Sequence, residues 1–157
     1  MGELSAPFLL IALALLLVSA GIEDARTREI ANWKNLAIAV LAPLWWLANG
    51  LALWPDMALQ LGVALAVFGF FAGAFALGQM GGGDVKLIGA LALWLPVLPL
   101  IWMLILMSLI GGALTLLLML EKKLRRPNPL PLEIPYGVAI AIAALIVLRE
   151  PIFNQFG

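Results

Sequence analysis

Two aspartates, Asp24 and Asp84, are the side chains best suited to chemistry in this sequence. Asp24 follows the first long apolar run, and Asp84, sixty residues later, follows three consecutive glycines. Two carboxylates that share a site cannot both ionise easily, so one of them holds a proton. The ionised member can then act as a base on a water while the protonated member acts as an acid on a carbonyl. The pair therefore predicts an aspartyl dyad that hydrolyses a peptide bond.

Missing residue types narrow the chemistry further. The chain contains no Cys and no His, which excludes Ser-His-Asp and Cys-His catalysis and the usual zinc sites. Acid–base groups must come from carboxylates, Lys or the single tyrosine, Tyr136. We expect no metal and no cofactor, because a dyad needs neither. A magnesium site built from the two aspartates is the alternative, but no phosphate-binding or nucleotide-binding motif accompanies them. We expect no nucleic-acid partner.

Each aspartate also has a purely structural interpretation. Asp24 lies near Arg26 and Arg28 and could anchor a helix end at the membrane surface. Asp84 could N-cap the helix that follows it.

Gly81, Gly82 and Gly83 favour a functional role for Asp84. Ordering three glycines is costly, and one is enough for a turn. A glycine loop permits close approach of another chain, and its free N–H and C=O groups can pair with an extended peptide.

The composition predicts a membrane protein. Of 157 residues, 64% are hydrophobic and 11% are charged, and the mean hydropathy is +1.10. A soluble domain is roughly half apolar and about a quarter charged. So much apolar surface cannot be hidden from water in a soluble core of this size. We therefore expect an all-α integral membrane protein.

Apolar stretches predict about six transmembrane helices, each needing about 20 apolar residues. Pro96 and Pro99 divide one long uncharged stretch into a short helix and a longer one. Glu3, and the absence of Lys and Arg before the first run, argue against a cleaved signal peptide. Trp45, Trp46 and Trp54 are expected as interfacial anchors. The expected spans cover residues 4–22, 35–55, 57–78, 85–95, 98–120 and 135–148.

Basic residues predict the orientation. With six spans, eight of the nine Lys and Arg residues fall on one side, and only Arg149 falls on the other. The positive-inside rule makes the basic side cytoplasmic. Both termini are then non-cytoplasmic, and both aspartates lie at the cytoplasmic face. The eight residues are Arg26, Arg28, Lys34, Lys86, Lys122, Lys123, Arg125 and Arg126.

Three motifs resemble those of the type IV prepilin peptidase family. Residues 24–32, Asp-Ala-Arg-Thr-Arg-Glu-Ile-Ala-Asn, resemble the family's Asp-x-Arg-x-x-x-Ile-Pro-Asn stretch. Residues 81–86, Gly-Gly-Gly-Asp-Val-Lys, match its Gly-x-Gly-Asp-x-Lys motif. Residues 134–139, Ile-Pro-Tyr-Gly-Val-Ala, resemble the start of its last helix. Ala31 departs from the pattern, because the family usually has Pro there.

This resemblance implies one membrane-embedded peptidase domain, residues 1–157, in the bacterial cytoplasmic membrane. Its catalytic residues would be Asp24 and Asp84, and its substrate the leader of a type IV prepilin. In its small size the chain resembles members of the short branch of the family, which processes Flp-type (tight-adherence) prepilins. Longer members carry a cysteine-containing insert and also methylate the new N-terminus. Since this chain lacks the insert, we expect no methylation.

Several residues are expected in supporting roles. Arg26 and Arg28 either tune the pKa of Asp24 or anchor the helix to anionic lipid. Lys86 either orients Asp84 or binds phosphate head groups. Asn32 is expected to hold the first loop through side-chain hydrogen bonds. Expected partners are the prepilin helix and the lipid bilayer, and the oligomeric state is left open.

Three alternatives compete with this interpretation. A presenilin-like intramembrane protease shares a Gly-x-Gly-Asp signature, but it should place its first aspartate within a span and carry a later Pro-Ala-Leu element. A proton-coupled transporter needs acids near the middle of the bilayer, and no predicted span has one there. A structural pilus-assembly subunit leaves the glycine run before Asp84 unexplained.

Overall fold

The chain folds entirely into helices over its described part. The computed structural model describes residues 2–124 and 133–156, and the side chains of residues 6–124 and 133–149. No strand occurs within these ranges. The elements are α1 (Gly2–Thr27), α2 (Asn32–Ala48), the π-helical turn η1 (Leu53–Met57), α3 (Ala58–Ala76), α4 (Gly82–Ala92), α5 (Val97–Leu124) and α6 (Tyr136–Phe156).

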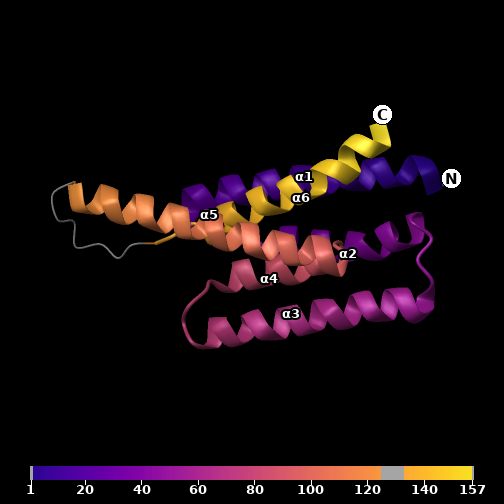
Figure 1. Ribbon diagram of the computed structural model, residues 1–157, viewed down its shortest axis with the longest axis horizontal. Coiled ribbons are helices and arrows are strands. Elements are labelled where there is room, and N and C mark those ends of the chain that lie inside the picture. Colours follow the sequence, from indigo (N-terminus) through magenta and orange to yellow (C-terminus); the bar gives the residue numbers. More distant parts are fainter. Residues whose placement is uncertain (1, 125–132, 157) are drawn as a thin grey trace.

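The helices lie roughly along the long axis of an elongated bundle (Figure 1). The short α4 packs against α2, α3 and α6, whereas α6 also contacts α1 and α5. α1 begins and α6 ends at one end of the bundle. At the opposite end, which we call the site end, α1 and α5 finish and α4 and α6 begin (Figure 1).

α4 forms the centre of the core. Leu87, Ile88 and Leu91 have no exposed surface, and Gly89 and Ala90 beside them are also buried. A helix that is apolar on all its faces belongs in an interior. Its 11 residues give a length of only about 16 Å, short of the roughly 30 Å hydrocarbon layer. α4 is therefore enclosed by longer helices.

Three helical stretches are long and apolar enough to cross a membrane. They are Ala6–Thr27, Leu53–Ala76 and Val97–Leu124, and Tyr136–Arg149 is a shorter apolar helix. Large apolar side chains such as Phe70 face outward on the surface, as lipid allows and water does not. The protein is a membrane protein. Six spans and non-cytoplasmic termini remain predictions.

The helix expected over residues 35–55 ends earlier in the structure, so the last third of that prediction is wrong. α2 ends at Ala48, and the chain turns at Gly50, whose φ of +68° is in the left-handed region that glycine adopts readily. Helical structure resumes only at Leu53. Trp54 therefore belongs to the following element.

Trp46 is likewise not the interfacial anchor that we expected. Its side chain is 8% exposed, and its Nε1 donates a hydrogen bond of 2.7 Å to the carbonyl of Leu93. The indole therefore joins α2 to the end of α4. A buried Trp N–H usually finds such a partner.

Candidate active site

Asp24 continues the buried stripe of α1. Leu10, Leu13, Leu17 and Ala20 recur every three or four residues and are fully buried, so they share the core-facing side of the helix. Asp24, in the last turn, is four residues further along and is only 4% exposed. α1 therefore places a carboxylate in the core at the site end.

The start of α6 closes over this carboxylate. The backbone N–H of Val138 donates a hydrogen bond of 3.1 Å to Oδ2 of Asp24. The first amides of a helix lack full intrahelical partners and attract negative charge. A Cβ on Gly137 would lie 2.8 Å from Cγ of Asp24 and 2.8 Å from Cδ1 of Ile30. Only glycine therefore lets α6 approach this closely.

Asp84 lies in the first turn of α4, ahead of the span predicted for residues 85–95. Gly81, not Asp84, is the N-cap, so the predicted N-capping role is wrong. Asp84 instead accepts a hydrogen bond from the backbone N–H of Gly81, as an acid in the first turn does when it reaches back to the cap. Burial, and secondarily the negative charge of Asp24, raises the pKa of Asp84 to about 7. This carboxyl group can therefore hold a proton near neutral pH.

The two aspartates line the same cavities. A cavity of about 590 Å³ contains Asp24 and Asp84 together with Tyr136, and a smaller one of about 280 Å³ contains both aspartates and the glycine run. Arg28 and Glu29 also line both cavities. The fold thus brings two buried carboxylates, sixty residues apart in sequence, into one solvent-accessible site.

The glycine run is not the loop that we expected. Gly82 and Gly83 are helical, and the carbonyl of Gly83 accepts a hydrogen bond of 3.1 Å from Nδ2 of Asn35. A Cβ on Gly83 would lie 3.4 Å from Cβ of Ile30. The run therefore serves close packing of the first loop on α4. Helical residues cannot pair with a substrate in strand fashion, so that expectation is wrong for Gly82 and Gly83.

Of the residues expected in supporting roles, Asn32, Lys86 and Arg28 lie close to the aspartates, and Arg26 does not. Asn32 and Lys86 lie together, because Nζ of Lys86 donates a hydrogen bond of 2.8 Å to Oδ1 of Asn32. Asn32 lines the smaller cavity. Arg28 lies beside the aspartates, whereas Arg26 is exposed and lines neither cavity. Of the two arginines, only Arg28 is placed to act on the site.

A half-buried ion pair between α1 and α2 was not predicted. Nζ of Lys34 lies 2.8 Å from Oε2 of Glu23, and it also donates to the carbonyl of Ser19 at 3.2 Å. The same Oε2 accepts a hydrogen bond of 3.1 Å from the backbone N–H of Ala31. Lys34 is 7% exposed and lies within α2. It is a paired core residue, not the loop charge that we expected when we predicted the orientation.

Two further residues escaped the sequence analysis. Asn35 is 4% exposed, and its Oδ1 has no hydrogen-bond partner among the described residues. Gly137 belongs to a motif that resembles the last helix of the family, but its contact with Asp24 depends on packing between distant helices. Within the described side chains, no three His, Cys, Asp or Glu residues come together as a metal site would require.

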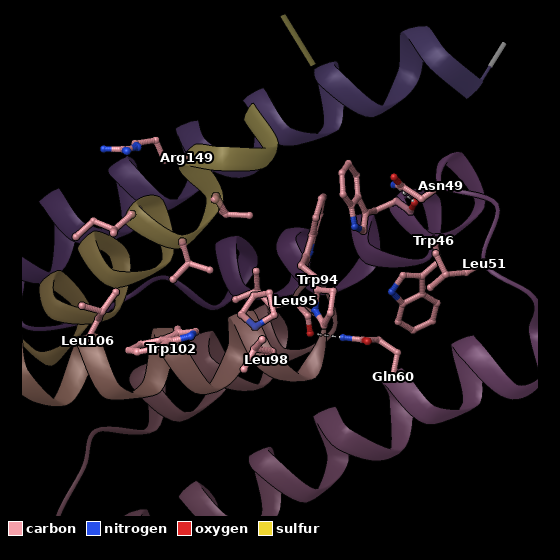
Figure 2. A pocket seen from close by; sticks show the side chains of 16 residues that line it. Trp46, Asn49, Leu51, Gln60, Trp94, Leu95, Leu98, Trp102, Leu106 and Arg149 are labelled. Atoms are coloured by element: carbon pink, nitrogen blue, oxygen red, sulfur yellow. Dashed lines mark hydrogen bonds between the residues drawn. The ribbon is translucent and has the colours of Figure 1, made fainter. Parts of the chain in front are cut away.

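A further cavity lies at the other end of α4 (Figure 2). It measures about 750 Å³ and is lined by Trp45, Trp46, Trp94 and Trp102. Nε2 of Gln60 donates hydrogen bonds of 2.8 and 2.6 Å to the carbonyls of Ala92 and Leu95 (Figure 2), which ties α3 to this end. Neither aspartate lines this cavity, so it is separate from the carboxylate site.

A comparison with protein families gives one match over residues 11–116, to the type IV leader peptidase family. The matched region contains both Asp24 and Asp84 and more than half of the chain. No curated protein and no solved structure matches the sequence.

Proposed function

The chain belongs to the type IV leader peptidase family, and we propose that it is a prepilin leader peptidase whose catalytic residues are Asp24 and Asp84. Membership in this family implies a peptidase. The observation that supports the aspartyl mechanism most strongly is the shared cavity: two buried carboxylates line it, and the pKa of one, Asp84, is raised to about 7.

In the proposed reaction, the proton begins on Asp84. Asp24 starts ionised and accepts the hydrogen bond from Val138. Asp24 removes a proton from a water, whose oxygen attacks the scissile carbonyl carbon, and Asp84 donates its proton to the carbonyl oxygen. The tetrahedral gem-diol then collapses: Asp84 takes back a proton from one hydroxyl, the C–N bond breaks, and the leaving nitrogen takes the proton held by Asp24. The second product is a carboxylic acid, and no metal or cofactor takes part.

We propose that the site faces the cytoplasm of a bacterial inner membrane and that the substrate is a Flp-type prepilin. Arg26, Arg28 and Lys86 lie at the site end of the bundle, and α5 reaches Lys122 and Lys123 there (Figure 1). This concentration of positive charge supports the orientation. The chain's short first loop supports cleavage without N-methylation.

Thiol labelling tests the orientation, because the chain has no native cysteine. In intact cells, cysteine introduced at Lys123 should resist a membrane-impermeant thiol reagent, and cysteine at Asp56 should react. Both positions are exposed. The reverse pattern would place the aspartates on the wrong side for a cytoplasmic leader.

Co-expression with a panel of Flp-type and other type IV prepilins tests the function. Wild-type enzyme should remove the leader from at least one prepilin, and Asp24→Asn enzyme should not. Mass spectrometry of the product reports the cleavage site and any added methyl mass. We expect unmethylated product, and we expect purified enzyme to cleave in excess EDTA. Activity that EDTA abolishes and a divalent ion restores would contradict the aspartyl mechanism.

A further inference from the structure

We infer that a lateral groove along α4 receives the transmembrane helix of the substrate and guides its scissile bond to the aspartates. The inference rests on the proposed function, because only a leader peptidase has such a substrate. The groove, of about 670 Å³, lies between α2 and α3 with α4 as its floor. We call it the α4 groove.

One face of α4 makes the floor. Lys86, Gly89, Ala90 and Leu93 line the groove, and their spacing of three or four residues places them on one side of the helix. Glycine and alanine keep the middle of this floor low. A Cβ on Gly89 would lie 2.7 Å from Cδ2 of Phe68, so glycine is needed for α3 to pack this closely on α4.

The walls are apolar and exposed. Leu36 of α2 is 64% exposed, and Leu65 and Phe68 of α3 are 62% and 42% exposed. In a membrane protein, exposure alone does not distinguish a docking surface from a surface that faces lipid. The position of the α4 groove relative to the aspartates is the distinguishing feature.

The α4 groove adjoins the smaller of the two cavities that contain the aspartates. Asn32 lines both the groove and the smaller aspartate cavity. Lys86, which bonds Asn32 at 2.8 Å, lies two residues after Asp84 at the same end of the groove. The groove therefore meets the smaller aspartate cavity at Asn32 and continues along α4 into the apolar part of the bundle.

A prepilin has matching features. Its scissile bond lies just outside an apolar helix. The enzyme must therefore bind an apolar helix and, directly next to it in the sequence, an extended segment. From Lys86 to Leu93 the groove runs about 10 Å, or roughly two helical turns. Substrate backbone that leaves the helix for cleavage needs hydrogen-bond partners at this depth. Lys86 and Asn32 supply polar groups at that point.

The tryptophan-lined cavity at the other end of α4 is not a competing site for this role. It shares no residue with either aspartate cavity. A helix bound there would leave its end far from the dyad, at the opposite end of α4. Of these two apolar cavities, the α4 groove is the one that shares a residue, Asn32, with a cavity containing the aspartates.

Filling the groove tests the inference. Leu36→Trp and Leu65→Trp add bulk to its walls, and Leu116→Trp, at an exposed position of α5 (69%) that does not line the groove, is the matched control. Each purified variant is assayed on a cleavable prepilin from the panel and on a peptide that spans the cut but lacks the helix. For prepilin, the groove variants should raise KM at least tenfold. Peptide cleavage should be unchanged, and the control should resemble wild type on both substrates.

Disulfide trapping gives a second measurement that does not depend on the tryptophan variants folding. A cysteine at Leu65 should cross-link to a cysteine in the first two turns of the prepilin helix, and a cysteine at Leu116 should not. Equal cross-linking at Leu65 and Leu116 would overturn the inference. So would groove variants that cleave prepilin as fast as the control, which is the result expected if the groove holds lipid and not substrate. Failure of the proposed function is distinct, since wild-type enzyme would then cleave neither substrate.

Discussion

Replacing Gly137 with alanine should slow catalysis by displacing Asp24. The new Cβ would lie 2.8 Å from Cγ of Asp24, 2.9 Å from its Oδ2 and 2.8 Å from Cδ1 of Ile30. Two of these three neighbours are atoms of a proposed catalytic carboxylate. Because α6 also donates the Val138 amide to that carboxylate, the clash must move Asp24 relative to both α6 and the substrate.

The size of the effect follows from the overlap. Carbon atoms normally approach to about 3.5 Å, so the carboxylate or the helix must shift by about 0.7 Å. A misplacement of about 1 Å can cost roughly 100-fold in rate. We therefore expect Gly137→Ala to lower kcat by about 10- to 100-fold with little change in KM. Overpacking should also lower stability, by about 1–3 kcal/mol.

Gly112→Ala is the matched control, since a Cβ on Gly112 has no neighbour within 4 Å. In a helix interior, alanine is about 1 kcal/mol more favourable than glycine, so this variant should be active and at least as stable as wild type. Steady-state cleavage of prepilin in detergent, with a thermal midpoint for each variant, checks both expectations. If Gly137→Ala has the kcat of the control, Gly137 does not position Asp24 as described.

Three other perturbations follow from the same contacts. Asn35→Leu should lower stability by about 1 kcal/mol, seen as a lower thermal midpoint, because the partly buried carbonyl of Gly83 loses its donor; an unchanged midpoint would contradict this. Burial raises the pKa of Asp84 to about 7, so kcat/KM should fall above pH 7 as its proton is lost, and a rate that keeps rising to pH 9 would contradict its role as acid. The same shift should lower stability as pH rises from the unfolded pKa of 3.8 to about 7, since only the unfolded chain then releases the proton. Ala31→Pro should keep most activity, because the φ of −58° at Ala31 suits proline. It should lower the thermal midpoint, since proline has no N–H to donate to the carboxylate of Glu23. A higher midpoint would show that the hydrogen bond from Ala31 to Glu23 is unimportant.

The membrane class and the two aspartates could be predicted because their signals are local. Composition alone indicates burial in lipid, and each aspartate directly follows an apolar run or a glycine motif. The family match over residues 11–116 confirms the resemblance that these motifs suggested.

Other features depend on distant contacts that no local pattern reveals. Lys34 resembles a loop charge in sequence, yet Glu23, eleven residues earlier, draws it into the core. Trp46 resembles an interfacial anchor until α4 supplies a carbonyl for its indole N–H. Gly137 gains its importance only because α6 begins beside the end of α1, 113 residues earlier in the sequence.

Ala31 shows how a departure from a family pattern can be compensated. The family usually has proline at this position, which fixes φ without a hydrogen bond. Here the alanine adopts a φ of −58°, within the range of proline, and its free N–H bonds the carboxylate of Glu23. The loop between α1 and α2 thus has a φ at Ala31 that suits proline, together with a hydrogen bond that proline could not donate.

Single-turnover cleavage of one prepilin by wild type, Asp24→Asn, Asp84→Asn and the double variant tests the central claim most directly. Each single substitution should reduce the rate by at least about 1000-fold, and the double variant should be little slower than either, because the two groups act as a unit. Thermal midpoints close to that of wild type would show that the variants remain folded. A single variant that cleaves at nearly the wild-type rate, or a double variant whose loss is the product of two moderate losses, would contradict the dyad.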